Sequence, residues 1–406
     1  MTVKSRLPLV SIITPSYNSG RFLEDALRSI LAQDYPHIEH LVIDGGSTDD
    51  TLQILKRYQN RITWMSKPDE GQADALNKGF KLARGEVLGW LNADDTYQPG
   101  AVGSAVAWLQ SHPAVDLVYG GFNFINEGRE ILYTHIPPQF SLEKLLYGDI
   151  IPQAAMFFRR RIIEEIGGVD PHLHYVMDWE FVLRIARNYR VQRVPAVWGN
   201  FRITRGTKSV EEPQYCWPEI IPVLQSAIEA EPVRLGPWAD DALLMAHLLA
   251  ALEFARVGQK ENTRDYIRRA FPVGAHHRRH LASLVPVIIG VATRPWHRGF
   301  AAHPEAQKAL DGFSICLGDT PAQRRLLGYL SLSRSIEAGK RGELSTAKEF
   351  IKTGLHLIKL TDLIQRQPFG MLLAAIIGTQ VIAKLRMLKN RFIIYLISGI
   401  NKTQRI

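Results

Sequence analysis

The chain has 406 residues, of which 46% are hydrophobic and 22% are charged, so it is a globular protein long enough for two domains. Its two cysteines, Cys216 and Cys316, offer neither metal-ligand spacing nor a disulfide framework, which fits a reducing cytoplasm. The segment before the first expected strand has no apolar run, so no signal peptide is expected.

The formal net charge of +9 would suit nucleic acid, anionic lipid or phosphorylated ligands. Its location narrows the choice, because after Asp362 the chain has seven Lys and Arg residues and neither Asp nor Glu. The basic excess therefore lies at the C-terminus. Aromatic residues are not interleaved with the basic runs, which argues against nucleic-acid binding.

The first half of the chain alternates apolar runs with amphipathic segments. The apolar runs predict buried strands over residues 9–14, 38–43, 62–65, 87–91, 115–118, 154–158 and 191–197. Apolar residues at helical spacing separate the first four of these runs, and another such helix begins at Asp178. Strands and helices that alternate with short loops predict a mostly parallel sheet flanked by helices. A domain boundary is expected near residue 213.

Two carboxylates follow the strand over residues 87–91, in the sequence Asn92-Ala93-Asp94-Asp95. Open α/β sheets bind ligands at the C-terminal edge of their strands. Paired Asp oxygens at that edge suit a hard divalent cation such as Mn2+ or Mg2+. The alternative is that both are loop residues whose side chains hydrogen-bond the backbone of the following turn.

Six segments carry a resemblance to one known family by their order and spacing. They are residues 10–18 (VSIITPSYN), 43–49 (IDGGSTD), 67–79 (KPDEGQADALNKG), 92–95 (NADD), 152–160 and 177–184. Together they resemble family 2 glycosyltransferases over about residues 8–209. The resemblance implies the GT-A (Rossmann-like) fold and the transfer of a sugar from a nucleotide-sugar with inversion.

The resemblance implies a nucleotide-sugar site built from several loops. Its residues would be Pro15, Ser16, Tyr17, Asn18, Asp44, Gly71, Asn77, Asn92 and Asp94. Residues 15–18 would form a floor for the base, and the Asp44 carboxylate would accept a hydrogen bond from a base N–H. The alternative for residues 44–49 is a tight turn in which Ser47 or Asp49 caps the next helix. The two descriptions can hold together.

By the same resemblance Asp95 is a metal ligand, and Asp94 contacts the ribose or joins the metal shell through water. The cation, Mn2+ or Mg2+, would neutralise the diphosphate as it leaves. Asn92 stands where the family often has Asp. This departure implies a weakened set of ligands and not a lost site.

Asp178 corresponds, in the resemblance, to the general base that removes the proton of the acceptor hydroxyl. Met177 stands where Glu is usual, and Asp178 could instead serve as a helix N-cap. The resemblance also implies that Gln153 and Trp179 lie on the acceptor side. Trp179 is equally well explained as a core residue, and Glu180 as a solvated acid in the first helical turn.

Residues 201–209 form a polar, basic loop after the last expected strand. Thr204 stands where the family often has a His that completes the metal shell, so no His ligand is expected. Arg202, Arg205 and Lys208 are candidates to close over the diphosphate. A plain solvated loop is the alternative.

Residues 214–362 are expected to form a helical domain. Segments 248–271 and 331–355 share a pattern of small residues that resembles tetratricopeptide hairpins. Two copies are fewer than a stable solenoid needs, so a plain helical appendage is the preferred interpretation.

Residues 363–406 form a basic tail, in which apolar runs over 371–383 and 392–400 flank a cluster of Lys and Arg. Each run is too short to span a bilayer. The tail is therefore expected to lie on an anionic membrane surface, and core or dimer helices are the alternative.

These expectations combine into one function. The protein would move a sugar, from UDP as the carrier, to a saccharide or lipid-linked acceptor in cell-envelope polysaccharide synthesis. It would be cytoplasmic and peripheral on the inner membrane face. A non-catalytic nucleotide-sugar sensor or scaffold is the alternative, favoured by Met177 and Thr204. A sugar nucleotidyltransferase fits less well, because residues 15–18 do not form a Gly-rich phosphate loop with Lys or Arg. The oligomeric state is left open.

Overall fold

The structure is a computed structural model that describes residues 7–147, 151–204, 207–271, 304–318 and 320–340, with residues 345, 349, 352 and 353. The strands are β1 (Val10–Ser16), β2 (Ile38–Asp44), β3 (Thr63–Ser66), β4 (Val87–Trp90), β5 (Thr96–Tyr97), β6 (Leu117–Ile125), β7 (Ile131–His135), β8 (Met156–Arg159) and β9 (Val191–Arg202). The helices are α1 (Leu23–Leu31), α2 (Thr51–Tyr58), α3 (Gln72–Leu82), α4 (Ala101–Ser111), α5 (Leu142–Leu146), α6 (Arg161–Ile166), α7 (Met177–Asn188), α8 (Lys208–Glu211), α9 (Cys216–Ala230), α10 (Pro232–Arg256), α11 (Lys260–Ala270), α14 (Pro304–Cys316) and α15 (Pro321–Lys340). The sheet, helices α1 to α11 and helix α14 belong to one compact unit, and α15 belongs to a second.

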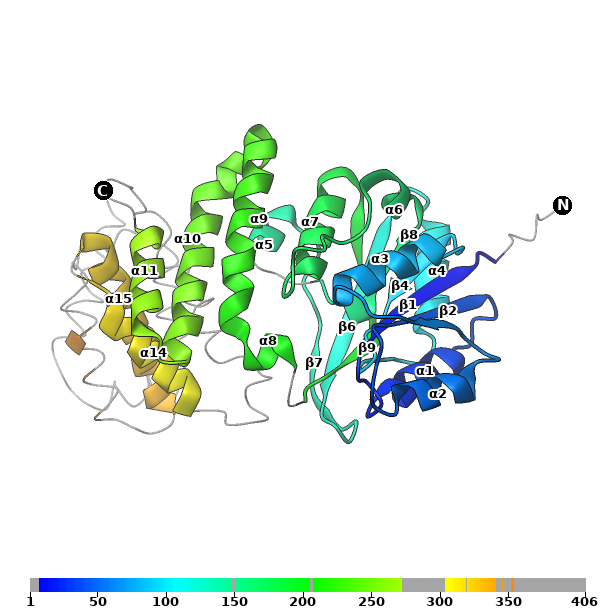
Figure 1. Cartoon of the computed structure of the whole chain (residues 1–406). Coiled ribbons are helices and arrows are strands. Elements are labelled where there is room, and N and C mark those ends of the chain that lie inside the picture. Colours follow the sequence, from blue (N-terminus) through cyan, green and yellow to red (C-terminus); the bar gives the residue numbers. More distant parts are fainter. Residues whose placement is uncertain are drawn as a thin grey trace, which may run out of the picture. The chain divides into compact units, whose positions relative to one another are not determined.

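The strands form one sheet in the order β3-β2-β1-β4-β8-β6-β9-β5, with β7 paired to β6 (Figure 1). β1 pairs in parallel with β2 and β4, and β2 pairs in parallel with β3. β8 runs antiparallel to both of its neighbours, β4 and β6. The expected parallel arrangement therefore holds for the first four strands. The sheet as a whole is mixed, because β5 and β7 also run against their neighbours.

Helices cover both faces of the sheet, and Figure 1 shows α3 and α7 on one side and α1 and α2 on the other. On the α3 side, Phe80 and Phe181 stack with ring centroids 6.2 Å apart, and both meet Phe158 of β8 edge-on. Gly79 lets α3 approach closely, since a Cβ there would lie 2.4 Å from the Cγ2 atom of Ile13. The central strands β1, β4 and β8 are therefore buried on both faces, which explains why they are mostly apolar.

The sequence pattern did not predict four elements that lie between β4 and β8, which are β5, β7, α4 and the five-residue helix α5. β5 has only two residues, too few for a periodic signal. β7 exposes most of its side chains, so apolar and polar positions do not alternate along it. α4 is almost uniformly apolar, with small residues on all sides, which weakens its helical periodicity.

The helical part begins with the paired helices α9 and α10, and α10 turns into α11 at Gly258, which has a φ of 79°. This turn lies where the first tetratricopeptide-like hairpin is expected. The second expected hairpin lies mostly outside the described residues, and the tail of residues 363–406 lies wholly outside them. Within the described ranges, no helix is both long and apolar enough to cross a bilayer.

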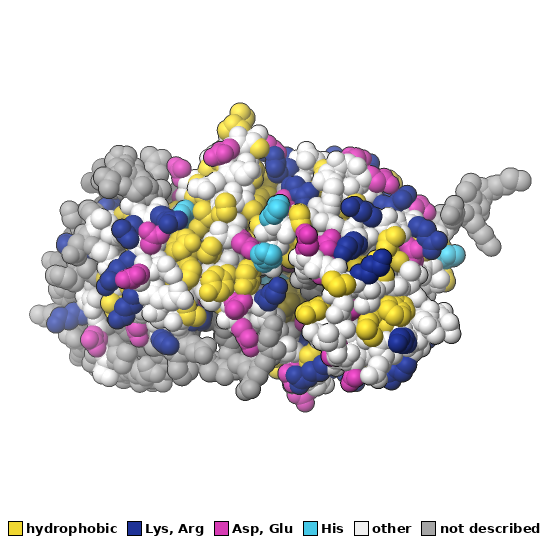
Figure 2. All heavy atoms as spheres, in the orientation of Figure 1, with side chains coloured by type: hydrophobic (Ala, Val, Ile, Leu, Met, Phe, Trp, Pro, Cys, Tyr) yellow, Lys and Arg dark blue, Asp and Glu magenta, His cyan; other side chains and the backbone are white. Residues whose placement is uncertain are grey.

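Charged side chains of both signs are interspersed on the face shown in Figure 2. Several of the molecule's charges form ion pairs, such as Arg28 with Glu24 at 2.8 Å and Arg84 with Glu39 at 2.6 Å. Pairs with an exposed partner each contribute only about 0–1 kcal/mol. The fold therefore depends mainly on the apolar layers on the two faces of the sheet.

Candidate active site

Three loops meet at one edge of the sheet because the strands that carry them are parallel. Ser16 is in register with Asp44, and Ile13 is in register with Trp90. The loops that follow β1, β2 and β4 therefore leave the sheet side by side, at the edge where α/β sheets bind ligands. The structure thus brings residues 15–18, Asp44 and residues 92–95 together, as the sequence predicts.

The loops after β1 and β2 are joined by hydrogen bonds. The backbone N–H of Asn18 donates to Ser47 Oγ at 2.7 Å, and the N–H of Thr48 donates to Asn18 Oδ1 at 2.9 Å. Asn18 has a positive φ of 47°, which this pair of bonds stabilises. Tyr17 is nevertheless 64% exposed, so its ring stands out from a rigid loop and is available to a ligand.

Asp44 is buried and binds its own turn. Its Oδ2 atom accepts from the backbone of Gly46 and Ser47, at 3.1 and 2.9 Å, and from the Ser66 hydroxyl at 2.6 Å. Its Oδ1 atom accepts from the Ser47 hydroxyl. The tight turn expected over residues 44–49 is therefore present, but the N-cap of α2 is Asp50 and not Ser47 or Asp49. A carboxylate oxygen can accept more than one bond, so Oδ1 retains capacity for a ligand N–H. Beside it, the Ser16 hydroxyl is buried without a partner among the described residues.

Asp94 and Asp95 are adjacent carboxylates at the same edge. Asp95 is 1% exposed; its Oδ1 atom accepts from the backbone N–H of Arg202 at 3.0 Å, and its Oδ2 atom accepts from Gln153 Nε2 at 3.1 Å. Burial raises the pKa of both carboxyls, and the charge of Asp94 raises the pKa of Asp95 further. The Arg202 guanidinium offsets this only in part, because it is paired with Asp25, so the two carboxylates still lack a positive counter-charge of their own.

A divalent cation would supply that counter-charge, so the chemistry of the pair fits the implied metal. Among the described residues, no group of three or more His, Cys, Asp or Glu side chains could hold an ion. Asp94 and Asp95 would therefore provide only part of a shell. Phosphate oxygens and water usually provide the rest of such a shell for Mg2+ or Mn2+.

Arg202 does not close over the site, and this corrects the sequence-based expectation. It is the last residue of β9, its side chain is fully buried, and its guanidinium lies 4.7 Å from the Phe22 ring centroid. Its Nε donates to the Asp94 carbonyl at 2.8 Å, and its other nitrogens donate to Asp25 Oδ2 at 3.0 Å and the Glu127 carbonyl at 2.8 Å. Arg202 therefore fixes the loop that carries the two aspartates.

Replacing Arg202 by Met is expected to destabilise the protein by about 2 kcal/mol, because a fully buried guanidinium is lost and its three acceptors, which are half-buried or exposed, lose their donor. Urea unfolding followed by circular dichroism measures this change. Arg129→Met is a matched control, since Arg129 also pairs with Asp25 but is exposed. Equal stability of the two variants would contradict the structural role of Arg202.

Two other residues assigned to the donor or acceptor have structural contacts instead. The Asn77 side chain donates to the Val169 carbonyl at 2.9 Å and accepts from the Val169 N–H at 3.0 Å, so it fixes the segment before α7. Gln153 is buried and donates to Asp95 from within the protein. Neither arrangement matches the predicted direct contact with a substrate.

Asn92 and Gly71 shape the loop edge. Asn92 Oδ1 accepts from Gln72 Nε2 at 2.9 Å and from Trp90 Nε1 at 2.8 Å, which joins the loop after β4 to the start of α3. Gly71 precedes α3 with a φ of 110°, a conformation that disfavours other residues. The amide group of Asn92 keeps donor capacity toward a ligand.

Asp178 lies in the first turn of α7, and its side chain is half-buried. The N-cap of this helix is Val176, so the alternative that Asp178 is the cap is wrong. Its Oδ1 atom accepts from the Trp179 N–H at 2.8 Å. Burial raises the pKa of Asp178 to about 6, a value that suits a general base near neutral pH.

The neighbours of Asp178 belong to the core. Trp179 is 4% exposed and donates from Nε1 to the Leu145 carbonyl at 3.1 Å, so the core alternative is correct and the sugar-platform prediction is wrong. Glu180 is not solvated but buried, and it pairs with Arg184. Met177 is buried as well. Asp178 is thus the one acid in this turn that keeps access to solvent.

The loop after β9 is described only in part. Thr204 is buried, and its hydroxyl lies 3.2 Å from the Thr207 hydroxyl. Lys208 is exposed, as a closing residue would have to be. Arg205 lies outside the described residues.

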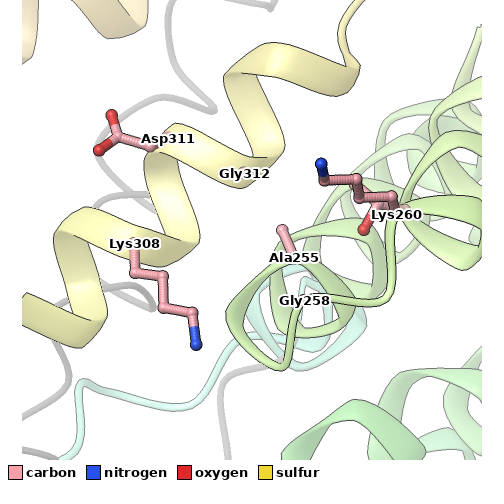
Figure 3. A pocket seen from close by; sticks show the side chains of 7 residues that line it. Ala255, Gly258, Lys260, Lys308, Asp311 and Gly312 are labelled. Atoms are coloured by element: carbon pink, nitrogen blue, oxygen red, sulfur yellow. The ribbon is translucent and has the colours of Figure 1, made fainter.

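A hollow of about 520 Å³ lies between the α10–α11 turn and α14 (Figure 3). It is lined by Ala255, Gly258, Lys260, Thr263, Lys308, Asp311 and Gly312. α10 and α14 approach closely here, since a Cβ on Gly312 would lie 3.2 Å from the Ala255 carbonyl oxygen. No residue of the sheet edge lines it, so this hollow is separate from the candidate active site.

Comparison with known proteins identifies the family. The family model "Glycosyl transferase family 2" matches residues 11–167. An uncharacterized glycosyltransferase of Mycobacterium tuberculosis is 37% identical over 183 residues, which cover 44% of this chain and 69% of the relative. The chain belongs to glycosyltransferase family 2. A PGL/p-HBAD biosynthesis glycosyltransferase of Mycobacterium bovis is 33% identical to this glycosyltransferase over 186 residues, covering 45% of this chain and 71% of the relative.

A solved structure supports the fold of this glycosyltransferase. A mannosyltransferase from Pyrobaculum calidifontis, determined in complex with GDP-Man and Mn2+, matches it with a TM-score of 0.50 at 21% identity. The match covers 76% of this chain and 88% of that protein. The predicted GT-A fold with a helical C-terminal region is confirmed.

Proposed function

We propose that this glycosyltransferase transfers a sugar from a nucleotide-sugar to an acceptor hydroxyl with inversion. One observation carries the proposal. An exposed aromatic ring (Tyr17), a buried carboxylate (Asp44) and a pair of adjacent carboxylates, half-buried Asp94 and buried Asp95, lie at one edge of the sheet. Each suits one part of a nucleoside diphosphate.

On the donor side, the Tyr17 ring stacks on the base, and Asp44 Oδ1 accepts a hydrogen bond from a base N–H. Uracil, guanine and thymine each offer such an N–H; UDP is the carrier proposed here, and the donor panel below decides among the three. Asp94 and Asp95 would hold a divalent cation, which would neutralise the negative charge of the diphosphate. The mannosyltransferase from P. calidifontis, which was determined with GDP-Man and Mn2+, supports a metal-assisted donor site.

On the acceptor side, Asp178 acts as the general base. The acceptor oxygen forms a bond to the anomeric carbon while the bond from that carbon to the diphosphate oxygen breaks. The hydroxyl proton passes to the Asp178 carboxylate, and the electron pair of the broken bond leaves on the diphosphate. A single displacement of this kind inverts the configuration at the anomeric carbon.

The rate of transfer is expected to rise with pH and to level off above about pH 6, the pKa to which burial raises Asp178. Below that pKa the carboxyl is protonated and cannot accept the proton of the acceptor hydroxyl. Steady-state nucleotide release between about pH 5 and pH 8 measures the profile. A rate that falls as pH rises through this range would contradict the assignment.

The acceptor is a saccharide or lipid-linked molecule in cell-envelope polysaccharide synthesis. The M. bovis relative, which is named for PGL/p-HBAD biosynthesis, supports an assignment to glycoconjugate assembly. The basic tail of residues 363–406 would bring the protein to an anionic membrane surface at the inner face, where such acceptors are made. Residues 1–213 would form the catalytic domain, residues 214–362 a helical domain.

Nucleotide release from a panel of UDP-, GDP- and dTDP-sugars, with Mn2+, with Mg2+ or with EDTA, tests the function. We expect one donor to release its nucleoside diphosphate slowly in the presence of metal, because water can replace the acceptor. Donor binding without any release, even with added acceptor mixtures, would support the alternative of a nucleotide-sugar sensor. The Met177 side chain in place of the usual Glu favours that second candidate.

A further inference from the structure

The segment that leads into α7 is held by a carboxylate from the helical part of the chain. Glu219 of α9 accepts hydrogen bonds from three consecutive backbone amides. Its oxygens lie 3.0 and 3.1 Å from the nitrogen of His174, 2.8 Å from that of Tyr175 and 3.2 Å from that of Val176. The family match ends at residue 167, so Glu219 lies beyond the matched region.

These bonds hold the chain just before the helix. Val176 is the N-cap of α7 and makes no side-chain capping bond. Glu219 bonds the N–H groups of residues 174–176, so it fixes the segment that enters the helix and does not satisfy the free N–H groups of the first helical turn. A negative charge near a helix N-terminus also interacts favourably with the helix dipole. Glu219 therefore fixes the backbone only two residues before Asp178.

Residues that flank Glu219 hold α7 as well. Glu212 accepts from the Tyr175 hydroxyl at 2.5 Å, at the entry to the helix. At the other end, Arg187 forms an ion pair with Glu231, and Arg234 donates to the Arg187 carbonyl. The segment from residue 212 to residue 234 thus contacts both ends of the helix that carries Asp178, and Figure 1 shows α9 next to α7.

We propose that Glu219 is a positioning residue, through which the helical region sets the geometry of the general base. The inference rests on the proposed function, because it assigns Glu219 a role through Asp178. A base must lie within hydrogen-bond reach of the acceptor hydroxyl, and a displacement of about 1 Å can lower a rate about a hundredfold. The helical region is then part of the catalytic unit.

Glu219→Gln and Glu219→Ala, in the full chain, test the proposal. Gln keeps one carbonyl oxygen and can still accept from part of the segment, whereas Ala removes the acceptor. We expect kcat for nucleotide release to fall about tenfold in Glu219→Gln and about a hundredfold in Glu219→Ala. The KM for the donor should stay unchanged, because the donor loops follow β1, β2 and β4 and not α7. Hydrogen exchange of the amides at residues 174–176 should become faster in the same order.

Glu229→Gln is the matched control, since Glu229 lies on the same helix and is exposed. It should leave kcat, KM and exchange unchanged. If both Glu219 variants keep kcat within twofold of wild type, the proposal is wrong, and thermal unfolding shows whether Glu219→Ala remains folded. If Glu219→Ala does not fold, Glu219→Gln decides. A wild type that releases nucleotide from no donor would overturn the proposed function itself, which is a distinct result.

Discussion

Replacing Asp178 by Asn is expected to lower kcat about a thousandfold while the affinity for the donor stays unchanged, because general-base catalysis typically contributes factors of about 10²–10⁴. Asn has nearly the same shape and can still accept from the Trp179 N–H, but it cannot accept a proton. The local fold of α7 should therefore persist. Nucleotide release measures kcat, and calorimetry measures donor affinity.

Asp240→Asn is the control for this variant, because Asp240 is an exposed residue on α10. It should show wild-type rates. If Asp178→Asn keeps more than about a tenth of the wild-type rate, a direct role of its carboxylate in proton transfer would be excluded. Loss of donor affinity along with rate would point instead to a collapse of the site.

Replacing Asp95 by Ala is expected to abolish metal-dependent donor binding and to lower nucleotide release by a factor of at least about 10². The replacement removes one of the two carboxylates that would hold the cation. It also removes the acceptor for the Arg202 N–H and for the Gln153 side chain. The amide variant Asp95→Asn keeps one oxygen for the Arg202 N–H and directs its NH2 group at Gln153, whose amide can turn over to accept from it, so this variant separates the two effects.

The negative charge of Asp95 is expected to lower the free energy of unfolding when no metal is bound. Burial and the neighbouring Asp94 raise the pKa of Asp95 well above its usual value, so its ionised form destabilises the fold in the absence of metal. Asn imitates the protonated form. Thermal unfolding without metal should therefore show a Tm for Asp95→Asn equal to or above that of wild type. A large drop in Tm with unchanged Mn2+ binding would make Asp95 a structural residue.

The sequence predicted the part of the fold in which hydrophobic periodicity is clear. The first four strands and the first three helices are found, because each has a local pattern that neighbours do not override. The sequence also predicted that the loops after β1, β2 and β4 lie at one edge of the sheet, since the C-terminal ends of parallel strands meet there. The strands β5 and β7 were not predicted, and neither was the antiparallel direction of β8, because pairing partners far apart in the chain leave no local signal.

The candidate site was predicted less well wherever contacts between distant segments decide a residue's role. Arg202 and Asn77 look like ligand-binding residues in sequence, yet each binds backbone groups far away in the chain. Trp179 could be a platform or core, and only its contact with Leu145 decides. The role of Glu219 could not be predicted from the sequence. Its partners are backbone N–H groups, which every residue except proline has, so no residue type marks the contact.

The measurement that tests the central claim most directly is the configuration of the first-formed sugar, followed by proton NMR during hydrolysis of an α-linked nucleotide-sugar. Direct displacement with Asp178 as the base predicts that the β anomer accumulates first and then mutarotates toward equilibrium. Initial release of the α anomer would show retention of configuration. That result would contradict a single displacement and the role assigned to Asp178.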